Sequence, residues 1–265
     1  MINYFIIKKF IKSLYHLGII KFINSYKSYY IGYKVLKEEI KNKIDFILGR
    51  NFPVLDDRYT NSGTAKGSYF YQDLLVAQRI FENNPKVHID IGSRVDGFVA
   101  HVASFRPILI IDIRPLKTEI QNISYIQHDL MTPVNNNLCE ACDSLSCLHA
   151  LEHFGLGRYG DPINYNGHLI GLESLYKLLK VNGKLYLSVP IGLPQRIEFN
   201  ANRIFSLKYL LEQFKEKYIL DNFSYVDDDG NLYRNIQINK KNIEENFGIK
   251  GNGREGCGIF EMTKI

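Results

Sequence analysis

Apolar positions along the chain change their spacing in a regular way, and these changes predict strands and helices in turn. Five short apolar runs have the length of buried strands, and they cover residues 87–92, 107–113, 123–130, 143–150 and 184–190. Runs with helical spacing cover residues 69–81, 98–105 and 168–180, and the last of these ends at Asn182-Gly183. Near-continuous apolar strands that alternate with helices are typical of a mainly parallel sheet covered on both faces. We therefore expect a doubly wound α/β fold.

Polar residues stand at the carboxyl end of each expected strand. In a doubly wound sheet, ligands bind at this edge, close to the point where the strand order reverses. The residues concerned are Asp90 and Gly92, Asp112, Asp129, His149 to His153, and Pro190 to Gly192. Their shared position predicts one ligand site along the edge.

The turn after the first strand, DIGSRVDG, favours a nucleoside ligand that lacks a phosphate group. Asp112 follows Gly92 by 20 residues, where a carboxylate can accept hydrogen bonds from ribose hydroxyls. A dinucleotide fingerprint would need its second glycine where Arg94 stands. Asp90 would repel a phosphate and attract a cationic sulfonium or amino group, which favours S-adenosylmethionine over a nicotinamide cofactor.

Four longer motifs, DIGSRVDGFVAHVASF, IIDIRPL, LHALEHFGLGRYGDP and RIEFNANRIFSL, carry a resemblance to a known superfamily. From residue 69 onward the chain resembles the class I S-adenosylmethionine-dependent methyltransferases, and more narrowly a methyltransferase-like family known only as a domain of unknown function. The resemblance implies a Rossmann-like sheet of seven strands in the order 3-2-1-4-5-7-6, with strand 7, residues 257–264, antiparallel. It puts Asp112 at the ribose and Asp129 at the adenine. The cofactor is then expected to bind at Asp90, Gly92, Ser93, Gly97, Asp112 and Asp129. Arg94 and Asp96 depart from the pattern, since many relatives carry glycine there.

The segment HALEHFGLGRYGDP has the letter pattern of an inverted zinc-protease motif, His149-x-x-Glu152-His153. That reading requires a helix, which Gly155, Gly157 and Gly160 would break. A zinc quartet built on Cys139-x-x-Cys142 is also disfavoured, because a structural site normally uses two separated ligand pairs. We therefore expect no metal.

The same segment is expected to carry the catalytic groups, as the resemblance implies for the loop after the fourth strand. Methyl transfer is an in-line displacement, so the enzyme chiefly orients the acceptor, and an alcohol acceptor also needs a base. His149 and His153 are the candidates, with His153 favoured, and Glu152 or Asp161 is the orienting carboxylate. The alternative is that either histidine is a satisfied residue at the strand end. Candidate acceptor-binding residues are Arg158, Tyr159, Arg196 and Asn200.

Positive charge is concentrated in residues 1–50, which hold ten Lys and Arg against three acidic residues, while the whole chain has a net charge of +5. We expect residues 1–50 to form a basic helical extension and residues 51–265 the methyltransferase-like domain. Residues 1–30 contain no apolar run long enough to span a membrane and no signal-peptide pattern. They predict an amphipathic helix that contacts anionic lipid or packs on its own domain. Four cysteines without a signal indicate a reducing compartment, so a cytoplasmic location with peripheral membrane contact is expected.

The function expected from these features is S-adenosylmethionine-dependent O-methylation of a sugar or surface-polysaccharide precursor. Two alternatives stay open, a degenerate methyltransferase-like binding module and an NAD(P)-dependent oxidoreductase. The acceptor is expected to be a small molecule or a glycan. Nucleic acid is not expected, because basic and aromatic residues are not interleaved in the catalytic half.

Overall fold

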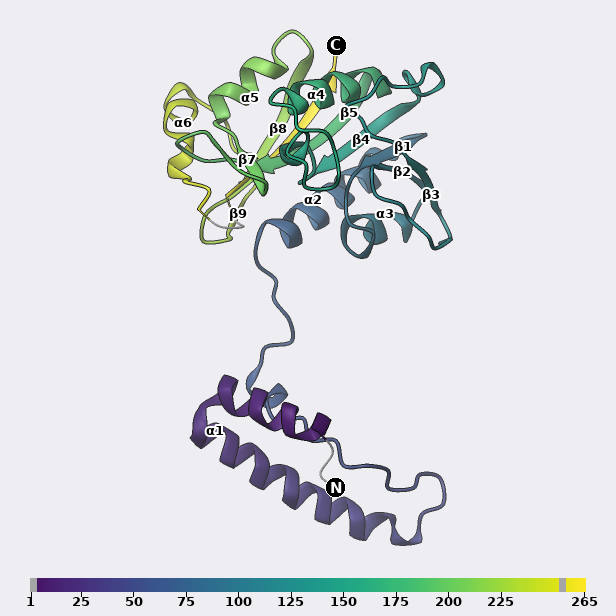
Figure 1. Ribbon diagram of the computed structural model, residues 1–265, viewed down its shortest axis with the longest axis vertical. Coiled ribbons are helices and arrows are strands. Elements are labelled where there is room, and N and C mark those ends of the chain that lie inside the picture. The colour runs from purple at the N-terminus through teal and green to yellow at the C-terminus, as the bar shows by residue number, and fades with distance from the viewer. Residues whose placement is uncertain (1–3, 253–255) are drawn as a thin grey trace. The chain divides into compact units, whose positions relative to one another are not determined.

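Two compact units, residues 1–64 and 65–265, make up the chain in the computed structural model, which describes residues 4–252 and 256–265 (Figure 1). The division falls after Thr64 rather than after residue 50. The reason lies in residues 51–59, which contact the first helix: Ser13 donates a hydrogen bond to Asp56 at 3.4 Å, and the Lys21 ammonium lies 5.5 Å from the Tyr59 ring.

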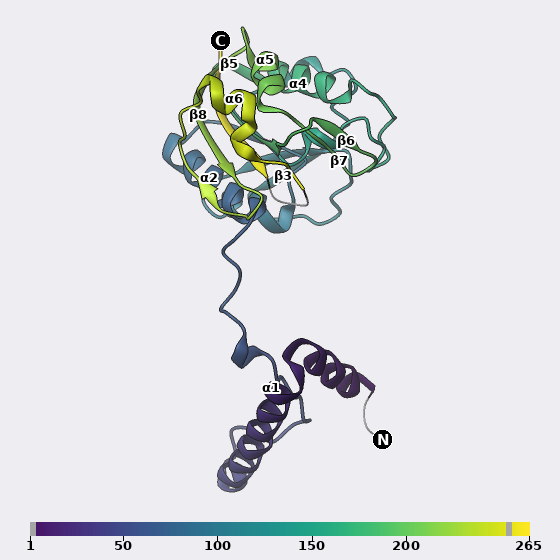
Figure 2. The same cartoon turned by 90° about the vertical axis from the view of Figure 1, so that its left-hand side faces the viewer.

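The first unit is built on one long helix, α1 (Tyr4–Glu39), which bends sharply at Gly18 (Figure 2). Gly18 has a φ of 70°, a value that glycine adopts without the strain caused by a Cβ atom. The two arms pack against each other through the Phe10 ring, whose centroid lies 5.8 Å from Phe22 and 5.6 Å from Tyr26. Short turns follow at η1 (Ile40–Asn42) and η2 (Asp57–Tyr59). Among the described residues, no helix has both the length and the apolar character that crossing a membrane requires.

The second unit contains an eight-stranded sheet in the order β3-β2-β1-β4-β5-β10-β8-β9. Strand β10 is antiparallel to both its neighbours, and β1 to β5 are parallel. The predicted order 3-2-1-4-5-7-6 is therefore confirmed for the main strands, but the predicted count of seven is wrong, because the short β9 adds an edge. The strands are β1 (His88–Ile91), β2 (Ile108–Asp112), β3 (Ile123–Gln127), β4 (Cys142–Leu148), β5 (Leu179–Pro190), β8 (Tyr218–Val226), β9 (Leu232–Tyr233) and β10 (Cys257–Lys264).

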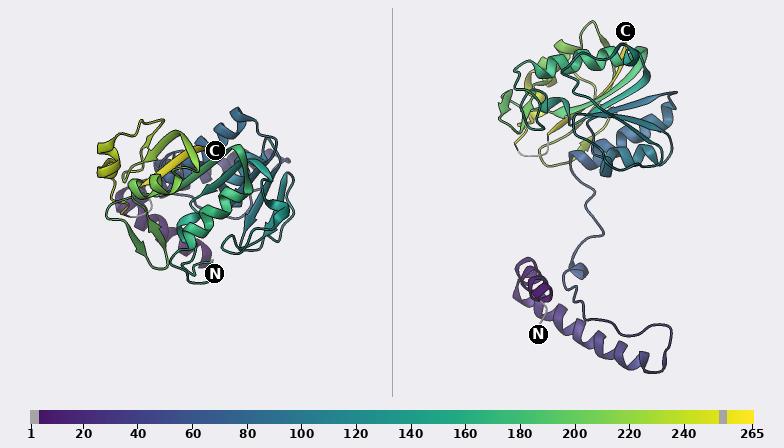
Figure 3. Two further views of the ribbon diagram at one scale, coloured as in Figure 1. Left: turned by 90° about the horizontal axis from the view of Figure 1, so that it is seen from above. Right: turned by 45° about the vertical axis from the view of Figure 1, so that its right-hand side comes forward.

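Helices cover both faces of this sheet (Figure 3). On one face, α2 and α3 pack with residues such as Ile80 and Val102, and on the other α4 and α5 pack with residues such as Leu175 and Leu210. Helix α3 is shorter than predicted, since residues 95–99 form a wide turn at its start. The helices are α2 (Ser68–Asn83), α3 (Ala100–Ala103), α4 (Gly167–Leu178), α5 (Leu207–Phe214) and α6 (Lys240–Glu245), and a separate hairpin is formed by β6 (Arg196–Glu198) and β7 (Asn202–Ile204).

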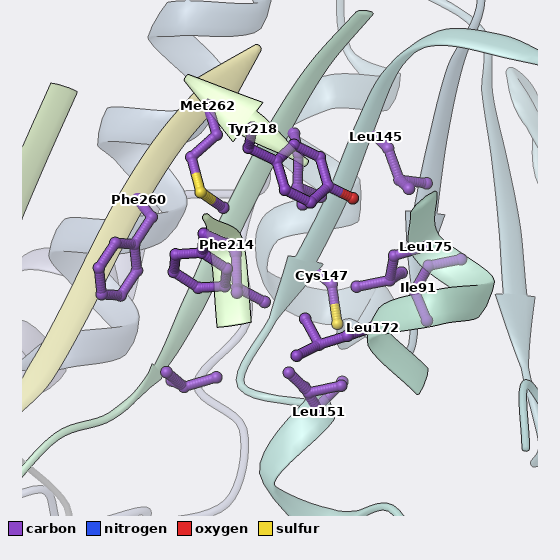
Figure 4. Close-up of a cluster of buried hydrophobic side chains, with 14 of the residues drawn as sticks. Ile91, Leu145, Cys147, Leu151, Leu172, Leu175, Phe214, Tyr218, Phe260 and Met262 are labelled. Atoms are coloured by element: carbon purple, nitrogen blue, oxygen red, sulfur yellow. The ribbon is translucent and has the colours of Figure 1, made fainter. Parts of the chain in front are cut away.

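The larger core lies between β4, β5, β10 and the helices α4 and α5 (Figure 4). The fully buried Leu175 of α4 lies near Cys147 of β4, and the Phe260 ring of β10 lies 5.3 Å from the ring of Phe214 in α5. Burial of a large aliphatic or aromatic side chain contributes roughly 1.5–3 kcal/mol. This core fixes the carboxyl end of β4, from which the next loop departs.

Candidate active site

The loop after β1 turns at Gly92, which has a φ of 70°. A Cβ atom at this position would lie 2.9 Å from the Cβ of Ala150, so the close contact between the ends of β1 and β4 requires glycine. The loop is then tied back to the strand, because the Ser93 amide and hydroxyl donate to the Asp90 carboxylate at 3.0 and 2.8 Å. Gly92 and the hydrogen bonds from Ser93 to Asp90 thus fix the shape of the loop without any ligand.

Asp90 lies entirely beneath this loop, in a buried polar chain that crosses two strands. Its carboxylate also accepts a hydrogen bond from Ser146 at 2.6 Å, and the Ser146 hydroxyl lies 3.1 Å from Nε2 of His88. Burial raises the pKa of Asp90 to about 7 and lowers the pKa of His88 to about 3. Asp90 is not among the described residues that line the cavities at this edge, so its position supports the loop from below.

Two cavities open at the carboxyl edge of the sheet. The smaller has about 510 Å³ of space and is lined by Gly92, Asp112, His128 and Asp129, at the ends of β1, β2 and β3. The larger is open to solvent and is lined by Ser93, Gly97, Glu152 and Arg158, together with residues of α2. Five residues line both: Gly92, Arg114, His149, His153 and Tyr159.

Asp112 ends β2 with its carboxylate in the smaller cavity and its side chain only 10% exposed. Arg114 binds this carboxylate through its backbone amide at 2.8 Å, through Nε at 3.0 Å and through Nη2 at 2.5 Å. Asp129 lines the same cavity, and its Oδ1 accepts a hydrogen bond from the Met131 amide at 2.9 Å. The structure therefore brings two of the three predicted strand-end acids into one cavity.

The loop after β4 holds two histidines around one buried glutamate. His149 adopts a φ of 50° and its Nδ1 lies 3.0 Å from Oε1 of Glu152, while Nε2 of His153 lies 3.6 Å from the same oxygen. Residues 151–153 form a single tight turn, and Gly155, Gly157 and Gly160 follow with positive φ. The segment is a compact loop rather than a zinc-protease helix.

The two histidines have opposite electrostatic environments. Burial alone lowers the pKa of His149, but Cys257 and the Glu152 carboxylate raise it well above its ordinary value. Burial lowers the pKa of His153, and the Glu152 carboxylate offsets only part of this effect. Burial raises the pKa of Glu152, but the two histidines lower it further than burial raises it. Since Nδ1 of His153 lies 2.7 Å from the carbonyl oxygen of Ala201, that nitrogen carries the proton of the neutral ring.

Asp161 and Arg203 hold this loop in shape. The Asp161 carboxylate accepts hydrogen bonds from the amides of Gly155, Gly157 and Tyr159 at 2.8 to 3.1 Å. The buried Arg203 donates to four carbonyl groups, those of Glu152, Phe154, Asn164 and Tyr165. Within the described ranges no hydrogen bond joins Asp161 to a histidine, so Glu152 is the carboxylate that contacts both rings.

The four candidate acceptor-binding residues separate into two pairs. Arg158 and Tyr159 line the larger cavity beside His153. Arg196 instead donates to the carbonyl groups of Pro194, Lys250 and Gly251, and Asn200 is exposed. Neither Arg196 nor Asn200 lines either of these two cavities.

Several lining residues were missed by the sequence reasoning. Tyr69 and Asp73 come from α2, which the apolar spacing assigned only to the core; the Tyr69 ring lies 4.9 Å from His149, and burial raises the pKa of Asp73 to about 6. Arg114 stands two residues after Asp112, and this spacing was the available signal. His128 has a buried Nε2 without a hydrogen-bond partner in the smaller cavity, and nothing in the pattern singled it out.

Comparison with known proteins defines the fold. A family model described as "Caenorhabditis protein of unknown function, DUF268" matches residues 99–248, whereas no curated protein matches the chain. The chain is similar to the structure of N-methyltransferase NodS from Bradyrhizobium japonicum WM9 in complex with S-adenosyl-L-homocysteine, at 12% identity over 88% of this chain and 97% of that one, with a TM-score of 0.50.

The chain is also similar in fold to two further solved structures. The 1,6-didemethyltoxoflavin-N1-methyltransferase of Burkholderia thailandensis is 10% identical over 73% of this chain and 77% of its own, with a TM-score of 0.50. The cyclase SpnF is 13% identical over 73% and 80%, with a TM-score of 0.52. These likenesses show the fold, which is that of the class I S-adenosylmethionine-dependent methyltransferases with an N-terminal helical extension.

Proposed function

We propose that this chain, which belongs to the family described as "Caenorhabditis protein of unknown function, DUF268", binds S-adenosylmethionine and transfers its methyl group to an acceptor. One observation carries the proposal: Gly92, Asp112 and Asp129, from three adjacent parallel strands, line one cavity that also contains His153. Two similar methyltransferases were solved with S-adenosylhomocysteine bound, which is consistent with the same cofactor here.

The residues around the smaller cavity fit a nucleoside. Asp112 is suited to the ribose hydroxyls and Asp129, beside the unpartnered His128 Nε2, to the adenine. The methionine end would then extend past Gly92 and Ser93 toward Gly97 and Asp73 in the larger cavity. Arg94 lines this cavity, and its guanidinium pairs with Asp96 at 2.8 Å, with the two side chains 67% and 72% exposed.

The catalytic base in this proposal is His153. Its lowered pKa keeps the ring neutral near pH 7, and its Nδ1 proton is directed to the Ala201 carbonyl, which leaves Nε2 to accept a proton. The nearby Glu152 carboxylate would stabilise the imidazolium that forms. His149, whose pKa is raised, is a poorer base and is better suited to orienting Glu152.

For the acceptor we propose an oxygen nucleophile on a sugar or surface-polysaccharide precursor, with Arg158 and Tyr159 as binding residues. Incubation of the protein with labelled S-adenosylmethionine and pools of sugar nucleotides, lipids or RNA tests this class directly. Label in the sugar-nucleotide pool supports it, and label only in RNA contradicts it.

The cofactor assignment is tested by calorimetry with S-adenosylhomocysteine and NAD on the wild-type protein. Heat with the first ligand alone is the expected result. Binding of NAD instead would favour an oxidoreductase, and binding of neither by folded protein would favour a non-catalytic binding module.

We also propose that residues 1–30 contact an anionic membrane surface on the cytoplasmic side, where the four cysteines stay reduced. Residues 1–3 lie outside the described residues. In α1, Ile11, Ile19 and Ile20 are 64%, 69% and 77% exposed among several lysines. Sedimentation of the full chain with vesicles of phosphatidylcholine alone or with phosphatidylglycerol should show binding to the anionic vesicles only, and Ile19→Asp should reduce it. Equal sedimentation with both compositions would contradict the proposal.

A further inference from the structure

We infer that Arg114 is a latch over the ribose-binding carboxylate of Asp112, and that cofactor binding turns its guanidinium toward the larger cavity to hold a phosphate group of the acceptor. The inference rests on the proposed function and makes it more specific, because it identifies the acceptor as a phosphate-bearing molecule. It depends on three features: the bonds between Arg114 and Asp112, the position of Arg114 between the cavities, and the charges that line the larger one.

The Asp112 carboxylate is already engaged. Oδ1 accepts from the backbone amide and Nε of Arg114, and Oδ2 accepts from Nη2, so three of the roughly four lone-pair positions of the carboxylate are taken. Two ribose hydroxyls therefore need the positions that the guanidinium occupies. The backbone amide bond can stay while the side chain leaves.

Water and the incoming nucleoside can replace the hydrogen bonds that release of the guanidinium breaks. The Arg114 side chain is 42% exposed, so water can hydrate the freed guanidinium, and the ribose hydroxyls can donate to the Asp112 carboxylate, which is only 10% exposed. The side chain also donates to the carbonyl oxygen of Gly92 at 3.2 Å, which ties the latch to the glycine of the cofactor loop. A nucleoside at Gly92 and Asp112 would contact both anchors of the closed latch.

Arg114 stands on the wall that the two cavities share. Its guanidinium carbon lies 4.6 Å from the centroid of the Tyr159 ring, and that of Arg158 lies 5.3 Å from the same ring. Arg114 and Tyr159 line both cavities, and Arg158 lines the larger. Rotation of the Arg114 side chain can thus move its guanidinium from Asp112 into the larger cavity without movement of the backbone.

The charges of the larger cavity favour an anion once the latch opens. Its carboxylates already have partners or reduced charge: Glu152 lies between the histidines, Glu198 pairs with Arg196 at 3.0 Å, and burial raises the pKa of Asp73. Arg158 donates to the Ala201 carbonyl at 3.0 Å and has no carboxylate partner among the described residues. Two guanidinium groups beside one aromatic ring then match the geometry of a phosphate group.

The test compares S-adenosylhomocysteine affinity in wild type, Arg114→Ala and Arg114→Lys by calorimetry, with Arg79→Ala as control. Arg79 also pairs with a carboxylate, that of Glu82 at 3.3 Å, but lines neither cavity. If the latch is closed in most molecules, its removal raises the apparent affinity by the inverse of the open fraction, about tenfold for a latch that is 90% closed. We expect Arg114→Ala to bind several-fold to tenfold more tightly than wild type, Arg114→Lys to lie between, and Arg79→Ala to match wild type.

A second arm uses inorganic phosphate as the probe, with acetate at equal ionic strength for comparison. Phosphate should tighten S-adenosylhomocysteine binding in wild type, because coupling between two ligands is reciprocal, and should have no such effect in Arg114→Ala. An equal effect of acetate, or a phosphate effect that survives in Arg114→Ala, would overturn the phosphate assignment.

Failure of the latch is distinguishable from failure of the proposed function. If wild type binds S-adenosylhomocysteine and folded Arg114→Ala binds it more weakly, Arg114 holds the cofactor and the latch is wrong. If neither protein binds it, the proposed function itself fails. Binding by Arg114→Ala alone would support a latch that is closed in nearly every wild-type molecule.

Discussion

Nε2 of His153 lies 3.6 Å from Oε1 of Glu152, and both side chains are buried in the turn that follows β4. Because the other ring nitrogen of His153 faces the Ala201 carbonyl, a proton gained at Nε2 would meet the carboxylate directly. This arrangement makes the pair the most informative target for mutation.

Replacement of His153 by Ala should lower turnover by about 10²–10⁴-fold while it leaves S-adenosylhomocysteine affinity nearly unchanged, since a base acts only as the acceptor loses its proton. His101→Ala is the matched control, because His101 lines the larger cavity but is bonded to the Gly97 carbonyl. Transfer of labelled methyl groups measures turnover. If neither His153→Ala nor His149→Ala lowers it, the loop is structural and the base must be sought at Glu198.

The kcat for methyl transfer should also fall as the pH is lowered, with a midpoint below pH 6.5. The neutral ring is the active form, and burial lowers the pKa of His153. Glu152→Gln should move this midpoint to still lower pH, because the carboxylate raises the pKa of His153. A pH profile of kcat for both proteins provides the measurement, and an upward shift in Glu152→Gln would refute the assignment.

Asp90 and His88 should give the folding stability opposite dependences on pH. The folded pKa of Asp90 is about 7, above the ordinary value of 3.8 for an aspartate, so between these pH values ionisation costs stability as the pH rises. The folded pKa of His88 is about 3, below 6.5, so its contribution is present above pH 6.5 and is lost as the pH falls toward 3.

In Asp90→Asn, the contribution of Asp90 to the pH dependence of folding stability is removed, so the contribution of His88 should be measured without it. Between pH 4 and 6.5, the free energy of unfolding should rise with pH more steeply in the variant than in wild type, by up to about 1.4 kcal/mol per pH unit. Urea denaturation at a series of pH values measures this slope. An unchanged slope would mean that Asp90 is ionised throughout.

Gly92→Ala should destabilise the protein and weaken cofactor binding. A residue with a Cβ atom is strained at a φ of 70°, and here that atom would also lie 2.9 Å from Ala150. Gly160→Ala is the control, because Gly160 has a φ of 87° but no atom within 4 Å of the added Cβ. Thermal unfolding should show a loss of about 1–3 kcal/mol from strain in each, and a larger loss in Gly92→Ala from the contact. Equal losses would show that the contact relaxes freely.

Asp112→Ala should weaken S-adenosylhomocysteine binding before it affects the chemistry, the reverse of the His153 variant. Asp112 ends β2 and lines the smaller cavity, whereas Glu152 follows β4. Loss of the Asp112 carboxylate would therefore remove hydrogen bonds to the ribose equally in the ground state and in the transition state. Calorimetry and kcat on the same protein separate the two effects, and a fall in kcat at unchanged affinity would argue against a ribose role.

Strands β1 to β5 could be predicted from sequence because each contains a separate apolar run; β10 followed only from the resemblance, and β8 was assigned no residue range. The two-residue β9 and the three-residue strands of the β6–β7 hairpin are too short to carry a periodic signal. Strand β5 begins at Leu179 rather than at residue 184, since Leu179 pairs with Cys142 before a shift in register, and such pairing depends on a partner far away in the sequence.

The place of a residue in the cavity was predictable where it follows from position along a strand, as with Asp112, Asp129 and the turn at Gly92. The environment of a residue was not predictable where it depends on a partner distant in the sequence. The burial of Asp90 depends on Ser146, and the distinction between His149 and His153 depends on Cys257, Ala201 and Arg158. Arg196 and Asn200 follow the fifth strand in sequence, but Arg196 turns to the 250–251 backbone and Asn200 to solvent.

The place of β10 in the sheet has a consequence for the order of events during biosynthesis. Strand β8 leaves the ribosome before β10, yet in the sheet its hydrogen bonds run to β10 on one side and only to the two-residue β9 on the other. Until residues 257–264 emerge, the exposed edges of β5 and β8 have no partner, and unpaired edges invite association with other chains. Nascent chains halted before β10 should therefore be substrates for chaperones, whereas β1 to β5 can already be paired.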